Sequence, residues 1–450
     1  MSRIRIIITI IVVVLTTLLT GCTGKEPNEI AYVVALGIDS TDDDNYKITI
    51  QYANTTQISG GASESGGKAG SEIVDNVTIE APNIYAGVGL ANNIVSKSFS
   101  MSHAKLIVFS KEVAEKGVKD MIETLVRSEE IRPDVFIAVA NTTANDYLTS
   151  VNPEMEVNPA QYYQLIYQKN QLVGIPDGQL REFFTGLYTD NYDSILPVAG
   201  VIEGSGGNSQ NDDKGQSKDS QNEGSEGSSE SLDSFESKSS NEKDENEKEK
   251  DAEKNTSKYE YDIKNYVGGE TAIEKKNKAE AIGAAVFEKD KMVGELGEVE
   301  TEICKMLKGD YTYSYLTYYN NDTPDIPITV KTTQQKKPKY KIDTDKKTVD
   351  IELYIESDLY SLPADYNVEN KIEDFERDVA NYTSSACTEF INNFTKKYNS
   401  DILKLNEKVK YKFLTNNQYN WFKKNVGWSE YKFSVCTNFK VRRTGLIVRK

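Results

Sequence analysis

The chain has 450 residues, of which 70 are acidic and 53 basic, giving a formal net charge of −17. This balance disfavours nucleic acid as a partner, because phosphates repel an acidic surface. His103 is the only histidine and the four cysteines lie far apart in sequence, which excludes metal sites built from several imidazoles or from closely spaced thiolates. With one histidine and no nucleophile-elbow motif, the sequence predicts a protein that is not an enzyme and needs no metal or cofactor.

The chain begins with a segment typical of a secretory signal. Arg3 and Arg5 precede an apolar run over residues 6–19, which is shorter than the ~20 residues that span a bilayer. The sequence LTGC at 19–22 resembles the lipobox of bacterial lipoproteins, in which the cysteine becomes the lipid-carrying first residue of the mature chain. We therefore expect residues 1–21 to be removed and Cys22 to anchor the protein to a membrane; an uncleaved signal anchor is the alternative.

Residues 22–203 alternate between predicted strands and helices, which is typical of an α/β layer structure. The expected strands lie at 30–39, 46–55, 76–81, 105–110, 134–141 and 194–203. The expected helices begin near Pro82, cover 111–130, begin after an N-cap at Thr142 or Thr143, and cover about 158–187. The composition of residues 59–72 predicts a flexible loop.

Residues 204–258 differ from the rest of the chain in composition. Residues 203–258 hold sixteen acidic and eight basic side chains and few apolar ones, too few to build a core. We expect an acidic disordered linker or surface insertion, with an interaction tail as the alternative.

The pattern over residues 259–450 predicts an α+β region in which a long helix packs on an antiparallel sheet. Its expected elements are a hairpin over 279–296 with its turn at 288–291, a helix to about Leu307, strands at 326–331, 339–344 and 348–357, an amphipathic helix within 370–398, and a final strand within 429–446. The whole chain is thus predicted to be a multi-domain α+β protein with mixed sheets and packed helices.

The aromatic residues and cysteines of this region carry further predictions. Tyr311, Tyr313 and Tyr315 alternate and suit either a cross-strand stack or an exposed docking surface. We expect Trp421 and Trp428 in the core or at a sheet end, with an interface role as the alternative. Setting the lipobox cysteine aside leaves three cysteines, an odd number that favours buried thiols over a complete disulfide framework.

Several short motifs follow one another along the chain. They are LTGC (19–22), LGID (36–39), HAK (103–105), RSEEIR (127–132), AIGAAVFEKDKMVGEL (281–296), YNSDIL (398–403), NVGWSEY (425–431) and FKVRRTGL (439–446). In this order and spacing they resemble the Ger(x)C family, the C-subunit lipoproteins of spore nutrient-germinant receptors. One departure is the start of the mature chain, where Thr23 follows the lipobox cysteine in place of the tryptophan common in the family.

The resemblance implies three compact domains in a mixed α+β arrangement, so that the acidic segment could interrupt the middle domain instead of separating two halves. It also implies an accessory subunit on the outer face of the spore inner membrane, beside two membrane-embedded subunits that bind nutrient and pass ions. Neither a catalytic residue nor a cofactor is implied. The alternative function is a solute-binding lipoprotein that presents a small molecule to a membrane transporter.

Four charged or titratable residues within these motifs are candidate contact residues. His103 suits a structural hydrogen bond, with a proton-sensing or ligand-contact role as the alternative. Lys105, Arg127 and Arg132 could contact a membrane partner or lipid headgroups. Salt bridges with acids such as Glu129-Glu130 are the simpler interpretation of these cations.

Overall fold

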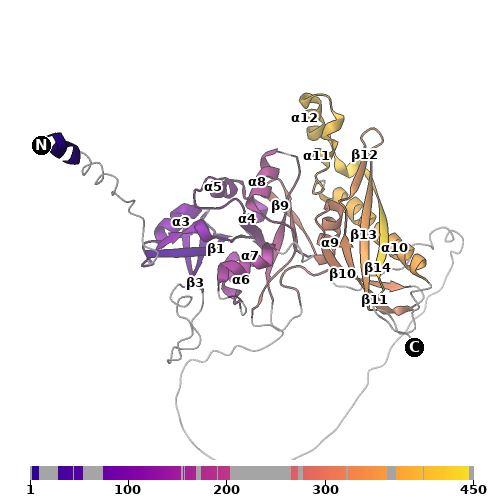
Figure 1. Ribbon diagram of the computed structural model, residues 1–450, viewed down its shortest axis with the longest axis horizontal. Helices are drawn as coiled ribbons and strands as arrows, with labels where there is room; N and C mark the ends of the chain where they lie inside the picture. The colour runs from indigo at the N-terminus through magenta and orange to yellow at the C-terminus, as the bar shows by residue number, and fades with distance from the viewer. Residues whose placement is uncertain are drawn as a thin grey trace, which may run out of the picture. The chain divides into compact units, whose positions relative to one another are not determined.

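The computed structural model describes two β-sheets and the helices packed on them (Figure 1). The described residues are 3–9, 29–43, 45–53, 74–153, 156, 158–168, 174–189, 191–202, 265–271, 277–320, 323–361, 371–398 and 400–444. Cys22, the loop predicted at 59–72 and the segment 204–258 lie outside them. Among the helices of the described residues, none is both long and apolar enough to cross a bilayer.

The first sheet is mixed, with parallel strands at its centre and antiparallel strands at both sides. Its order is β3 (Val74–Ala81), β2 (Tyr46–Ala53), β1 (Ile30–Ser40), β5 (Leu106–Ser110), β6 (Phe136–Ala140), β7 (Ile195–Val201), β8 (Ala279–Glu288) and β9 (Lys291–Leu296), with β4 (Ser98–Ser100) beside β1. Strands β1, β5, β6 and β7 run parallel. Every residue of β5 and β6 is buried, as expected where helices cover both faces of a parallel sheet.

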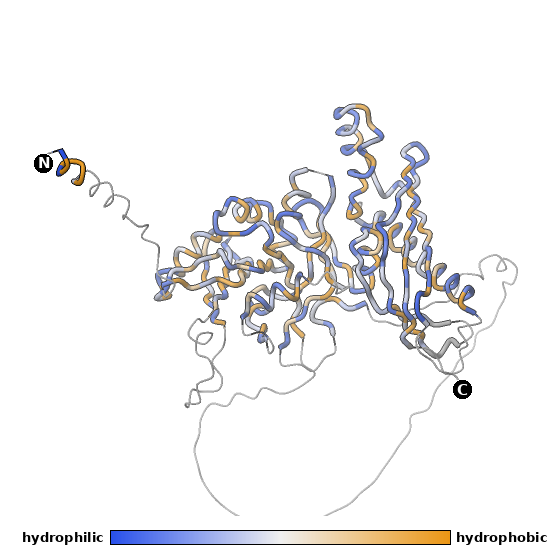
Figure 2. Tube along the Cα trace, in the orientation of Figure 1, coloured by the Kyte–Doolittle hydropathy of each residue, from blue (hydrophilic) through white to orange (hydrophobic). Residues whose placement is uncertain are grey.

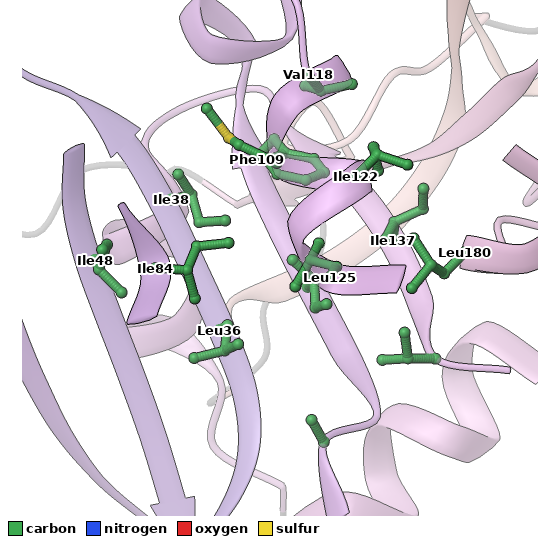
Figure 3. Close-up of a cluster of buried hydrophobic side chains, with 14 of the residues drawn as sticks. Leu36, Ile38, Ile48, Ile84, Phe109, Val118, Ile122, Leu125, Ile137 and Leu180 are labelled. Atoms are coloured by element: carbon green, nitrogen blue, oxygen red, sulfur yellow. The ribbon is translucent and has the colours of Figure 1, made fainter. Parts of the chain in front are cut away.

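Helices cover both faces of this sheet. One face packs against α3 (Ile84–Ala91), α4 (Lys111–Lys116), α5 (Lys119–Val126) and α8 (Leu180–Thr189). Figure 3 shows part of this core, where Ile122 and Leu125 of α5 belong to the same cluster as Phe109 of β5. The other face packs against α6 (Ala144–Ser150) and α7 (Pro159–Gln168), through residues that include Tyr147 and Tyr163.

Two helices expected from the sequence are each divided in the structure. The predicted helix 111–130 breaks between α4 and α5 at Gly117, whose φ of +121° lies outside the helical region. The predicted helix 158–187 is also wrong as one element, because α8 begins only at Leu180. Between them Gly178 lies against the sheet, where its carbonyl accepts a 2.7 Å hydrogen bond from Ile137 N–H. A side chain at Gly178 would collide with Pro197, so the chain can approach β6 only with glycine here.

The second sheet follows α9 (Glu298–Lys308) and has the order β10 (Tyr313–Asn320), β11 (Thr323–Gln334), β13 (Thr348–Ser361) and β12 (Lys339–Asp343), with β14 (Lys432–Arg443) also paired to β13. The predicted strands pair antiparallel as β11–β13 and β12–β13, and β10, which was not predicted, pairs antiparallel with β11. Strand β14 differs, since it runs parallel to β13. A parallel neighbour requires a crossover connection, which α10 (Ile372–Tyr398) and the short helices after it supply.

The long helix α10 packs one side on the second sheet, as its three-and-four spacing predicts. Phe375, Val379, Phe390 and Phe394 of the predicted stripe are all buried. The opposite face of the sheet carries the exposed side chains. Cys304 and Cys387 are buried free thiols, but the prediction is wrong for Cys436, which lies on the outward face of β14.

The structure likewise confirms some of the predictions for the aromatic residues and contradicts others. Trp428 is buried, whereas Trp421 is 69% exposed and is not a core residue. Tyr311 is buried, while Tyr315 is exposed and its ring lies edge-on to Tyr360, 5.4 Å between centroids. The three alternating tyrosines therefore do not form one stack.

The first sheet contains strands from both sides of the acidic segment. Strand β7 precedes residues 204–258 and β8 follows them, yet the two strands are antiparallel neighbours with Ile195 opposite Val286. Ala284, Val286 and Leu296 of the strands after the segment also pack into the core of the second sheet. Residues 204–258 therefore stand, in the sequence, between two neighbouring strands of one sheet.

Candidate functional site

The parallel strands β1, β5 and β6 end side by side at one edge of the first sheet. Open α/β sheets commonly bind ligands in the crevice at the carboxyl ends of such strands. A cavity of about 350 Å³ lies at this edge. Its lining is polar and consists of Asp39, Ser40, Ser110, Lys111, Glu112, Glu115, Asn141, Thr142 and Thr143.

Asp39, the last residue of the LGID motif, holds helix α6 in place. It is 5% exposed, and its Oδ1 and Oδ2 accept hydrogen bonds from Ala144 N–H (2.6 Å) and Asn145 N–H (3.1 Å). Burial raises the pKa of this carboxyl, and the two backbone bonds oppose that rise. Thr143 completes the helix start, since its hydroxyl accepts from Asp146 N–H as the predicted N-cap.

Several other polar groups around the cavity are also engaged within the chain. The Asn141 side chain donates to the Gly268 carbonyl, and Lys111 forms a 2.9 Å ion pair with Glu295. The Ser110 hydroxyl accepts from Val113 N–H at the start of α4. In the part of the chain that the structure describes, no group of His, Cys, Asp or Glu is arranged to hold a metal ion. These hydrogen bonds and ion pairs attach the ends of strands to the starts of helices. Among the described residues that line the cavity they form neither a nucleophile–base pair nor a metal site.

This role predicts the effect of removing the Asp39 carboxyl. Asp39→Ala should lower the free energy of unfolding by about 1–3 kcal/mol, because the buried Ala144 N–H and the partly buried Asn145 N–H lose their acceptor. Denaturant titration followed by circular dichroism measures the loss. The matched variant Glu112→Ala removes a carboxylate from the same cavity at a solvent-exposed position and should change stability little. Equal stability of the wild type and Asp39→Ala would contradict the role.

The residues singled out from the sequence lie at the opposite edge, near the amino end of β5. His103 is exposed and its ring lies edge-on to Tyr32, 5.0 Å between centroids. Lys105 is half-buried, and its backbone bonds to Val34 and Phe136 place it between β1 and β6. The structure therefore brings the HAK motif to a strand start and away from the cavity.

One acid of the RSEEIR motif bonds to the segment near the amino end of β5. Glu130 Oε2 accepts a 2.6 Å hydrogen bond from Met101 N–H, which connects the loop after α5 to the turn that holds His103. Arg127 is exposed and its ion pair, at 3.2 Å, is with Glu123, not with Glu129 or Glu130. Arg132 is exposed. The two motifs are thus neighbours, held together by a hydrogen bond from the Met101 backbone to the Glu130 side chain and not by the expected salt bridges.

A pair of acids that no local sequence pattern indicated connects the segment before β7 to the loop after α10. Asp401, within the YNSDIL motif, is 4% exposed, and its carboxylate accepts from Leu405 N–H (2.6 Å) and Asn406 N–H (2.8 Å). Its own N–H donates to Asp193 Oδ2 at 2.8 Å, and Asp193 N–H returns a bond to the Asp401 carbonyl. Burial raises the pKa of the Asp401 carboxyl to about 7. The 208-residue separation of this pair explains why no local pattern indicated it.

The raised pKa of Asp401 predicts a pH-dependent stability. The folded protein favours the protonated carboxyl more than the unfolded chain does, so this contribution is present below the ordinary pKa near 4 and is lost as the pH rises through about 7. The wild type should therefore lose stability between about pH 5 and pH 8 relative to Asp401→Asn, which cannot ionise. Thermal unfolding midpoints across this range measure the difference.

Asp350→Asn, an exposed change on β13, is the matched control and should keep the wild-type slope. The same pH slope in wild type and Asp401→Asn would show that Asp401 does not titrate in this range. The comparison uses slopes, so a constant loss of stability caused by the weaker Asn acceptor does not affect it.

Comparisons with known proteins agree with the order of these motifs. The family model described as "Spore germination protein N-terminal domain" matches residues 24–201, and "Spore germination B3/ GerAC like, C-terminal" matches residues 282–445. Similar proteins of Bacillus subtilis (strain 168) are spore germination protein KC, 26% identical over 176 residues, and the putative spore germination protein YfkR, 28% identical over 145 residues.

Those matches cover 36% and 32% of this chain and 43% and 37% of the relatives, so less than half of each relative's length is matched. The crystal structure of the GerBC protein aligns with 90% of this chain and 96% of its own, at 14% identity and a TM-score of 0.48. The two family models follow one another along the chain and together match most of its length. The chain belongs to the Ger(x)C family of spore germination proteins.

Proposed function

We propose that this protein is the lipid-anchored accessory subunit of a spore nutrient-germinant receptor, held on the outer face of the spore inner membrane beside two membrane-embedded subunits. The observation that carries the proposal is the match of both terminal family models, in order, to one chain. Membership of this family supports a role in germination. The receptor assembly and its subunit number belong to the proposal.

The lipid anchor in this proposal rests on the N-terminal sequence. Two arginines, a short apolar run and LTGC at 19–22 make Cys22 the expected attachment point. Two or more acyl chains on one cysteine give stable attachment, since each buried CH₂ contributes about 0.8 kcal/mol. His103, Lys105, Arg127 and Arg132 are proposed contacts for a membrane partner, because they gather at one exposed edge of the first sheet.

The body of the protein is proposed to be non-enzymatic. The buried acids Asp39 and Asp401 both accept backbone hydrogen bonds at helix starts, which is a structural use of a carboxylate. A related feature weighs against a solute-binding role for the cavity beside β1, because several of its polar groups, among them Asp39, Ser110, Lys111 and Asn141, already bond within the chain. A receptor subunit that acts through assembly needs neither a reactive site nor a ligand cavity of its own.

Deletion of the gene tests the receptor role. Spores that lack the protein should fail to germinate with one class of nutrient, while germination by a chemical trigger that bypasses nutrient receptors should remain normal. Loss of optical density after addition of amino acids, sugars or nucleosides measures the response. Unchanged germination with every nutrient, in a strain without a paralogue, would contradict the proposal.

Cys22→Ala tests the anchor. Without the thiol no lipid can be attached, so processing at residue 22 should fail and metabolic labelling with a radioactive fatty acid should disappear. Cys436→Ala, which removes an exposed thiol elsewhere, should keep the label and the wild-type mobility on a gel. Fatty-acid label that persists in Cys22→Ala would place the attachment at another residue.

A further inference from the structure

The segment that crosses from α10 to β14 carries an unusual exposed surface. It contains α11 (Leu405–Val409), the 3₁₀ turn Lys410–Lys412, α12 (Asn416–Asn425) and the 3₁₀ turn Trp428–Glu430. Outside residues 3–9, three of the four most exposed large apolar side chains of the described residues lie in its eleven-residue stretch 411–421. They are Tyr411 (79% exposed), Leu414 (95%) and Trp421 (69%).

The inner side of the segment is firmly packed, so these side chains are displayed by an ordered element. Phe413 and Phe422 contact each other at 4.9 Å between ring centroids, and Phe422 lies edge-on to Trp428. Tyr419 is buried and its hydroxyl donates to the Asn406 carbonyl.

Two lysines fasten the segment to its surroundings. Lys412 bonds to the Ile342 carbonyl of β12, beside which Figure 1 shows α11 and α12. Lys423 donates to the Thr189 carbonyl (3.0 Å) and to Asn191 Oδ1 (3.1 Å), so it connects α12 to the loop after α8. Trp421 on the outer side of α12 is therefore not needed to hold the helix.

The charge of the segment is opposite to that of the whole chain. Residues 405–424 carry five lysines and one acid, Glu407, and no acidic residue occurs from Lys408 to Ser429. Lys410 and Lys424 are exposed, and in the sequence Lys410 precedes Tyr411 directly while Lys424 follows Trp421 by three residues. A positive, aromatic surface on a protein of net charge −17 is complementary to an anionic one.

The residue pattern of α12 distinguishes between two anionic binding partners, a groove in another protein and a lipid bilayer. A helix that docks in a protein groove presents an apolar stripe at i, i+3, i+4 and i+7. The exposed face of α12 instead has Trp421 alone among Asn, Gln and Lys side chains, and Figure 2 shows this helix as mostly hydrophilic. Isolated Trp and Tyr rings among lysines suit the headgroup level of a bilayer, where amphipathic rings and cations are both favoured.

We propose that Tyr411, Leu414 and Trp421, with Lys410 and Lys424, form a second membrane contact that seats on anionic lipid headgroups. This membrane-contact patch is separate from the lipid anchor proposed at Cys22. The rings and Leu414 enter the interface, while the lysines neutralise lipid phosphates. This contact fixes the orientation of the protein relative to the membrane, which a single acylated residue does not do.

The two tryptophans make the contact directly measurable. Trp428 is 2% exposed and Trp421 is 69% exposed, so acrylamide should quench chiefly Trp421. The full-length lipidated protein is reconstituted into vesicles of phosphatidylcholine alone or of phosphatidylcholine with phosphatidylglycerol. On the anionic vesicles we expect a blue-shifted emission, reduced acrylamide quenching and new quenching by brominated lipid chains. Trp421→Phe should remove all three changes and leave the emission of Trp428.

Charge variants separate the patch from general attraction. Lys410→Gln with Lys424→Gln should abolish the protection of Trp421 on anionic vesicles, and raised salt should weaken it in the wild type. Lys336→Gln with Lys337→Gln removes two exposed lysines on the β11–β12 connection and should leave the protection intact. Flotation measures separately how much protein is attached to the vesicles. If the lipid anchor fails, less protein floats, but the quenching of Trp421 in the floating protein stays the same.

Three results would overturn the proposal. The first is equal acrylamide quenching of Trp421 on anionic and neutral vesicles. The second is protection that occurs only when other spore membrane proteins are present, which would assign the patch to a protein partner. The third is protection in solution without lipid, which would show that another part of this chain covers Trp421.

Discussion

The parallel strands β1, β5, β6 and β7 are buried on both faces, and the first half of the molecule is organised around that burial. Parallel neighbours cannot be joined by a tight turn, so each connection crosses over one face of the sheet and brings a helix with it. Apolar residues fill both faces, as the uniformly buried β5 and β6 show. The polar residues Asp39 and His103 accordingly lie at strand ends, Asp39 buried under α6 and His103 exposed.

Antiparallel pairing explains how the first sheet accommodates a long insertion. Strands β7 and β8 run side by side in opposite directions, so the chain that connects them has only to return to the same edge. The strands that follow the insertion belong to the first sheet and also pack into the second core, which makes them the structural link between the two.

Buried acids in this protein serve the architecture. Asp39 lies at the end of β1 and Asp401 in the loop between α10 and α11, yet each uses both carboxylate oxygens to accept N–H groups at the start of a helix. A body stabilised in this way is consistent with a subunit that works by position and assembly. In our proposals a lipid at Cys22 holds the body at the membrane, and the membrane-contact patch around Trp421 determines which surface faces the bilayer.

The sequence by itself determined most strands, the hairpin at 279–296, the stripe of α10 and the family, because these depend on local periodicity and on motifs in order. It did not locate the helix breaks at Gly117 and Gly178. Gly117 adopts a positive φ, and Gly178 lets the chain approach β6 closely; hydrophobic periodicity reports neither property. Only the tertiary structure decided that Trp428 is buried while Trp421 is exposed, that β14 runs parallel to β13, and that Asp193 meets Asp401. The physical reason is common to all three: each depends on contacts between residues far apart in the chain, and such contacts leave no local pattern.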